Sequence, residues 1–105
     1  MSALPTLTNL VRAEYPDDRY VTLMVLIENA AGAPRHTHPG LELTYVLEGE
    51  GILQVDGRPD QRFRSGDCIQ VPPGLPHSIQ AVGDRPGRAL QFLVIDKDKP
   101  QVCWL

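Results

Sequence analysis

The sequence predicts an all-β fold, either a sandwich or a barrel, and two observations lead to that prediction. Ten prolines and nine glycines occur among the 105 residues, and they fall between short apolar runs rather than within them. This placement is typical of turns that separate strands. The turns also leave little room for an interior helix of ten or more residues, because proline and glycine interrupt helices.

The elements can be predicted in chain order from these turns. A short helix is predicted only near the N-terminus, over residues 7–15. Seven strands follow, at residues 20–28, 41–47, 52–55, 61–64, 68–71, 78–82 and 89–96. Their spacing is typical of a sandwich or barrel. No internal repeat or linker divides the chain and its length suits one domain, so residues 1–105 are expected to form a single domain.

Charge and hydropathy exclude several classes of partner. The net charge is −3, and the ten basic residues are dispersed, so no Lys/Arg-rich run is available to follow a phosphate backbone. Nucleic acids and anionic membranes are therefore not expected as partners. The longest apolar stretch, residues 20–27, is far shorter than the ~20 residues of a membrane-spanning helix. Residues 1–10 lack the pattern of a secretory signal, and a cytoplasmic location is expected.

Two predicted strands, residues 20–28 and 89–96, are apolar on both faces. A half-exposed antiparallel strand alternates apolar and polar residues, so something is expected to cover the second face. Another sheet, a second subunit or the N-terminal segment could supply that cover. A homodimer is the favoured interpretation, because a small barrel has little chain left to cap itself.

The chemistry of the sequence is concentrated in its three histidines, His36, His38 and His77. The first two are spaced i, i+2, which on an extended strand points both rings to one side. Glu42 has a parity that can return its carboxylate to that side. Before His77, Pro73 and Gly74 suit the central positions of a type II turn. Three imidazoles and one carboxylate suit a divalent transition metal such as Mn, Fe, Ni, Cu or Zn, although such a histidine pair alone is more often solvated or part of a core.

The spacing of these residues resembles a known frame of two motifs. His36-Thr37-His38, Glu42 and Gly49 are similar to the first motif of the cupin superfamily, and Gly66, Pro72-Pro73-Gly74 and His77 are similar to the second. The sequence thus resembles a small single-domain cupin over residues 30–81. Ala30 stands where the first motif opens with glycine, and Ala81 stands where the second closes with asparagine. Neither position ligates metal in the family pattern.

The resemblance implies a jelly-roll barrel, or double-stranded β-helix, with His36, His38, Glu42 and His77 pointing inward around one metal ion. It also implies a metalloenzyme acting on a small organic oxyanion or enolisable substrate. Dioxygenation is the leading reaction, and isomerisation, decarboxylation and cyclisation stay open. The alternative is a small-molecule-binding or sensing module without turnover. No further catalytic group is evident, because every histidine is assigned to the metal.

The remaining pocket residues are harder to predict, because strand register is not fixed by the sequence. Parity with Glu42 sends Thr44 inward, and Met24, Gln70 and Phe92 are further candidates for lining the pocket. The C-terminal segment around Trp104 could close the pocket, pack on a partner or fray, and packing is the favoured interpretation.

Overall fold

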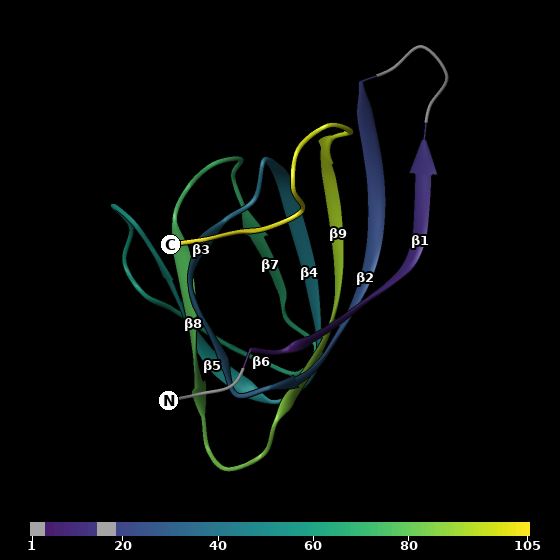
Figure 1. Cartoon of the computed structure of the whole chain (residues 1–105). Helices are drawn as coiled ribbons and strands as arrows, with labels where there is room; N and C mark the ends of the chain where they lie inside the picture. Colours follow the sequence, from purple (N-terminus) through teal and green to yellow (C-terminus); the bar gives the residue numbers. More distant parts are fainter. Residues whose placement is uncertain (1–3, 15–18) are drawn as a thin grey trace.

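The structure is a computed structural model, and it describes residues 4–14 and 19–105. These residues form two five-stranded antiparallel sheets that face each other (Figure 1). The first sheet contains, in spatial order, β1 (Thr6–Glu14), β2 (Tyr20–Ala30), β9 (Gly87–Asp96), β4 (Gly40–Glu48) and β7 (Cys68–Val71). The second contains β10 (Cys103–Trp104), β3 (Gly32–Thr37), β8 (His77–Val82), β5 (Glu50–Val55) and β6 (Gln61–Arg64). The prediction of an all-β jelly roll is confirmed.

Each of the seven predicted strands is present, with ends that differ by at most two residues. The predicted helix over residues 7–15 is wrong, because this segment forms β1 and pairs antiparallel with β2 from Thr6↔Glu28 to Glu14↔Val21. Pairing with an exposed strand edge overrides a weak local helical preference. Residue 15 of that predicted helix lies outside the described residues. Within the part of the chain that the structure describes, no helix is long and apolar enough to cross a membrane.

Two short strands, β3 and β10, were not predicted. Pro34 lies within β3, and the pairing of this strand with β8 is irregular between Ala33 and His36. A proline and a register shift hide the strand pattern in the sequence. β10 contains two residues and pairs with the end of β3, so the C-terminal segment crosses from β9 to the second sheet (Figure 1).

The core lies between the sheets and follows the alternation of the strands. One cluster of buried side chains comes from β2 and β9, namely Val21, Leu23, Val25, Leu93 and Ile95. A second cluster comes from both sheets, namely Val46, Leu53, Val55, Ile69 and Val71. Because side chains alternate along a strand, the residues between these positions face outward on the other side of each sheet.

The turn before His77 has the predicted form. Gly74 has a φ of 71°, which is the left-handed conformation required at the third position of a type II turn, and the Leu75 N–H donates to the Pro72 carbonyl at 3.5 Å. The Gly74 N–H also donates to the His38 carbonyl at 2.9 Å. This hydrogen bond ties the two histidine segments together.

Candidate metal centre

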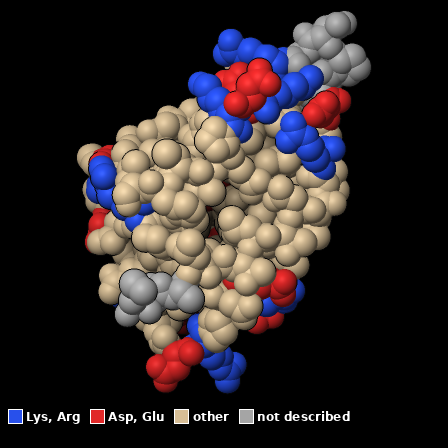
Figure 2. All heavy atoms as spheres, viewed as in Figure 1, with Lys and Arg blue, Asp and Glu red and all other residues tan. Residues whose placement is uncertain are grey.

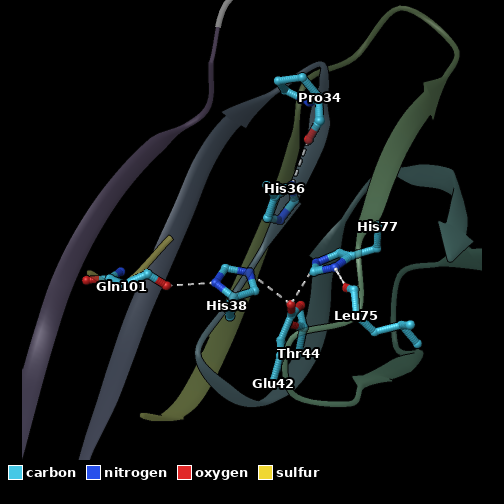
Figure 3. Close-up of polar contacts among 8 residues, drawn as sticks. All are labelled: Pro34, His36, His38, Glu42, Thr44, Leu75, His77 and Gln101. Carbon is cyan, nitrogen blue, oxygen red and sulfur yellow. Dashed lines mark hydrogen bonds and ion pairs between the residues drawn. The ribbon is translucent and has the colours of Figure 1, made fainter. Parts of the chain in front are cut away.

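The structure brings the three histidines and Glu42 together from strands of both sheets and, for His38, from the connection between β3 and β4 (Figure 3). His36 lies near the end of β3 and pairs directly with His77 at the start of β8. Glu42 lies on an inward position of β4 in the facing sheet. All four side chains are buried, with exposed fractions between 1% and 6%. Four ionisable groups buried at one point are costly for a fold unless something pairs them.

Each imidazole is oriented by a backbone carbonyl. The Nδ1 atoms hydrogen-bond to the carbonyl oxygens of Pro34 (from His36, 2.7 Å), Gln101 (from His38, 2.9 Å) and Leu75 (from His77, 2.9 Å). A carbonyl oxygen accepts but never donates, so each Nδ1 carries the proton. In the neutral ring, the lone pair is therefore on Nε2. Carbonyl partners of this kind are common behind metal-binding histidines.

The Glu42 carboxylate divides its two oxygens between different partners. Its Oε2 accepts a hydrogen bond from the Thr44 hydroxyl at 2.8 Å. Its Oε1 lies 3.1 Å from His38 Nε2 and 3.2 Å from His77 Nε2 (Figure 3). Among the described residues, these three buried atoms have no hydrogen-bond partner of acceptable geometry. Lone pairs that converge in this way repel one another unless a cation or a proton lies among them.

These atoms fit a divalent metal. One ring nitrogen from each of the three histidines lies within 4.8 Å of the other two, so the three residues form a group able to hold an ion. Glu42 Oε1 borders two of these nitrogens and would add an anionic oxygen. An N₃O donor set of this kind suits several first-row metals, and the set by itself does not select one.

Burial and the carboxylate set the protonation of the group. Burial lowers the pKa of His36 to about 4, so this ring is neutral near pH 7. Burial alone would also lower the pKa of His77, but the adjacent Glu42 carboxylate more than offsets this and the net pKa is raised. Burial raises the pKa of Glu42, while the His38 and His77 rings together hold it below its ordinary value. Glu42 is therefore a carboxylate at neutral pH, and the His77 ring holds a proton more readily than the His36 ring when no metal is bound.

A cavity of about 100 Å³ lies beside His36, His38 and Glu42 and extends between the sheets. Its wall is largely apolar and includes Ile27, Phe63, Ile69 and Ile79, with Thr44 and Gln91 as uncharged polar members. Figure 2 shows a face made mainly of uncharged residues, hollowed near its centre, where the colour of acidic residues is visible inside. The cavity therefore joins the buried ionisable group to the surface.

The predicted pocket residues separate into two groups. Thr44 lines the cavity, as its parity with Glu42 predicts. Met24, Gln70 and Phe92 do not, and the prediction for these three is corrected. The strand register explains the correction. Phe92 pairs with Met24 on one side and with Leu43 on the other, and Leu43 also pairs with Gln70. All four side chains therefore lie on the outward face of the first sheet. Their sequence neighbours, such as Leu23 and Leu93, face the core instead.

Three residues near the cavity were not predicted as part of the site. Gln91 is a single polar residue within an apolar strand, and that break in the pattern was a usable signal. The Trp104 ring lies 5.0 Å from the His36 ring and lines the cavity, so the C-terminal segment forms part of the cavity wall. The carbonyl of Gln101 orients His38, and a backbone contact over 63 residues leaves no signal in the sequence.

The comparison with known families decides the classification. A family model described as Cupin domain matches residues 22–95, which is more than half of the chain. The chain belongs to the cupin family. The four residues of the candidate metal centre all lie within the matched range.

Known proteins similar to this cupin include enzymes. It is 32% identical over 76 residues to dimethylsulfoniopropionate lyase DddQ of Ruegeria pomeroyi, covering 72% of this chain and 37% of the lyase. The crystal structure of that lyase has a TM-score of 0.73, with 26% identity, and the match covers 96% of this chain and 51% of the other. An acireductone dioxygenase of Rhodopseudomonas palustris is 39% identical over 61 residues, covering 55% of this chain and 37% of the dioxygenase.

A structure without an enzyme name is also similar to this cupin. A cupin-like protein of Thermotoga maritima has a TM-score of 0.64 and 26% identity, with 94% of this chain and 74% of the other covered. This cupin spans little more than a third of the length of the curated relatives that it matches.

Proposed function

We propose that this cupin is a metalloenzyme that acts on a small organic oxyanion or enolisable substrate, with dioxygenation as the leading reaction. The observation that carries the proposal is the convergence of His38 Nε2, His77 Nε2 and Glu42 Oε1, three buried atoms that lack hydrogen-bond partners among the described residues. His36, His38, Glu42 and His77 would be the ligands. The similarity to acireductone dioxygenase favours dioxygenation, and the similarity to a lyase keeps elimination, isomerisation, decarboxylation and cyclisation open.

The ion, when bound, would supply a Lewis acid or a redox centre for the substrate oxygen atoms. The side chains of the protein prepare the site for that chemistry. Three carbonyls hold the rings in one tautomer, and Thr44 holds the carboxylate so that Oε1 faces the nitrogens. The apolar wall of the cavity excludes bulk water and strengthens the electrostatic interactions inside.

A binding or sensing module without turnover is the alternative. The small volume of the cavity, about 100 Å³, and its largely apolar wall suit retention of a compact ligand as well as catalysis. The two functions differ in turnover and share the metal centre, so one experiment can test both.

The experiment measures metal content and then activity. Tag-free protein is reconstituted with Fe, Mn, Ni, Cu or Zn and analysed for bound metal, for melting temperature with and without chelator, and for oxygen uptake on diketones, catechols and enolisable acids. Near-stoichiometric metal with oxygen uptake supports a dioxygenase. Stoichiometric metal without uptake directs the search to Lewis-acid reactions or to the binding module. Absence of bound metal after reconstitution would overturn the proposed metalloenzyme and favour a metal-free binding module.

Two variants and a matched control test the ligand set. His77→Ala and Glu42→Gln are expected to weaken metal binding by more than the roughly 10–100-fold that loss of an outer partner costs, with the β-sheet circular dichroism retained. Glu14→Gln is the control, because it makes the same chemical change on the exposed β1. Full metal occupancy in both site variants would contradict the assignment.

We also propose that the outward face of the first sheet joins two copies of the chain. Cross-strand neighbours on this face are apolar, with Leu43, Phe92 and Met24 in one row and Tyr45, Leu90 and Leu26 in the next. Leu43 and Tyr45 are 44% and 43% exposed. A contiguous apolar surface of this kind marks an interaction site, and a two-fold dimer would bury the same face on both copies.

A further inference from the structure

Gln91 is a buried polar residue on β9 that makes no side-chain hydrogen bond within the described part of the chain. It is 5% exposed and lies on β9 between the outward-facing Leu90 and Phe92. Its side chain lines the cavity, and no hydrogen bond to the described residues involves its amide. The Gln91 amide is not among the buried polar atoms that are sealed from solvent, so it faces the space of the cavity. A polar group on an otherwise apolar cavity wall is available to a ligand.

The surroundings of Gln91 make this amide a separate recognition point. Its cross-strand partner is Thr44, whose hydroxyl already donates to Glu42. The nearby wall is apolar and includes Val46, Ile69 and Ile79. Among the charged residues that line the cavity, Glu42 belongs to the candidate metal centre, and Arg88 Nη1 pairs with Glu48 Oε1 at 3.1 Å. The arginine of the cavity wall is therefore already paired.

We propose that Gln91 is a specificity-determining residue that hydrogen-bonds a neutral oxygen of the substrate. The inference rests on the proposed function, because it assumes that the substrate oxyanion is anchored at the metal centre. An amide both donates and accepts, so it matches a hydroxyl or a carbonyl. A second carboxylate would have to compete with Glu28 and Glu48 for Arg88, the arginine of the cavity wall.

The register of the strands sets the spacing of the two substrate oxygens. Glu42 pairs with Leu93, and Thr44 pairs with Gln91. Inward positions two residues apart on a strand are separated by roughly 6.6 Å. The inferred substrate is therefore a short bifunctional compound with an oxyanion at one end and a hydroxyl or carbonyl a few bonds away, on an otherwise apolar body.

The test compares two probes that differ in one group. The zinc-loaded protein is titrated with 4-hydroxybutanoate and with pentanoate, in which a methyl group replaces the hydroxyl, by isothermal titration calorimetry. Wild-type protein is expected to bind the hydroxy acid about 5–10-fold more tightly, the ratio that one neutral hydrogen bond supplies. Gln91→Met is expected to remove that preference. Gln70→Met, the same change on the outward face, is expected to retain it.

A second measurement does not depend on the folding of a variant. In wild-type protein labelled with ¹⁵N, the side-chain amide signals of Gln91 are expected to shift when 4-hydroxybutanoate is added and to shift much less with pentanoate. Equal affinity of the two probes for wild type, an unchanged preference in Gln91→Met, or stationary Gln91 signals during hydroxy acid binding would each overturn the role of Gln91. Zinc content is measured on the same samples. Absence of bound zinc would overturn the proposed metal centre and this inference together, whereas the preceding outcomes leave the metal centre standing.

Discussion

At the scale of single residues, the site depends on which atoms carry protons. Backbone carbonyls fix the proton of each histidine on Nδ1, and the Thr44 hydroxyl fixes one oxygen of Glu42. The remaining lone pairs then point at one another. Hydrogen bonds behind the four proposed ligands therefore set which of their atoms are free to bind an ion.

The first prediction concerns Thr44. Thr44→Val keeps the shape of the side chain and removes the hydrogen bond to Glu42 Oε2, so the carboxylate loses its fixed orientation. We expect zinc affinity to fall about tenfold, which is the lower end of the cost of losing an outer partner. Competition with a chromophoric chelator measures the change. Thr22→Val, on the outward face of β2, is the control, and equal affinity in the Thr44 variant would show that the carboxylate is held without the hydroxyl.

The second prediction concerns pH. Because Glu42 raises the pKa of His77, metal binding near this pKa must displace a proton from that ring. Zinc affinity is expected to level off above the His77 pKa and to fall up to about tenfold per pH unit below it. His36, with its pKa lowered to about 4, adds a further loss only at lower pH. Calorimetry in buffers of different ionisation enthalpy measures the released proton.

The same raised pKa has the opposite effect on the stability of the metal-free protein, which falls as the pH rises, whereas zinc affinity increases. A raised pKa of His77 means that the folded state holds a proton that the unfolded chain releases. Its contribution to stability is therefore complete below the ordinary histidine pKa and is lost as the pH rises through the raised pKa. Zinc affinity that does not change between pH 5 and pH 8 would contradict the first effect. The stability of the metal-free protein, measured by denaturant unfolding over the same pH range, tests the second.

At the scale of elements, close contact between strands positions the ligands. A Cβ atom on Gly40 would lie 1.7 Å from the backbone oxygen of Val94, so β4 can start beside β9 only with glycine there. From that start, Glu42 reaches its inward position two residues later. On the second sheet, the pairing of β3 with β8 sets His36 opposite His77.

The third prediction concerns the C-terminal segment, which orients His38 through the Gln101 carbonyl and covers His36 with Trp104. The side-chain amides of Gln101 and Asn9 hold this segment to β1 through two hydrogen bonds of 3.0 and 3.2 Å. Removal of residues 101–105 is expected to lower zinc affinity about tenfold, because His38 loses its partner. Trp104→Ala retains the Gln101 carbonyl, so we expect it to lower zinc affinity much less than the truncation does. Equal losses in the two variants would assign the effect to the tryptophan alone.

At the scale of the whole molecule, the two sheets differ in their outward faces. The first sheet presents rows of apolar side chains, whereas β8 and β5 of the second sheet present Ser78, Gln80 and Gln54. The sequence predicts that β2 and β9 are apolar on both faces. In the structure, one face of each strand lies in the core and the other lies at the surface. A second copy of the chain is the proposed cover for the surface face.

The fourth prediction tests the proposed dimer by measuring the molecular mass of the protein in solution. Wild-type protein is expected to have twice the mass of one chain by light scattering after size-exclusion chromatography. Leu43→Glu places a charge in the apolar face and is expected to yield the mass of one chain, with the fold retained. Val82→Glu is the control, because Val82 is 37% exposed on the second sheet. A wild-type protein with the mass of one chain at all concentrations would refute the dimer.

Much of the fold and the candidate site was predictable because local patterns encode it. Turn residues between short apolar runs predicted seven of the strands, and the spacing of His36, His38, Glu42 and His77 predicted the group that the structure brings together. Parity along β4 also placed Thr44 in the cavity. Each of these predictions depends on the spacing of residues within one segment or on the two sequence motifs that the cupin family shares.

The tertiary structure alone decided which strand faces line the cavity and what holds the ligands. Met24, Gln70 and Phe92 face outward and Gln91 faces inward because cross-strand pairing sets register, and a shift of one residue would reverse every face. The N-terminal segment is a strand because β2 offers it an edge to pair with. The carbonyl that orients His38 comes from Gln101, a contact that the path of the backbone creates and that side-chain identity does not encode.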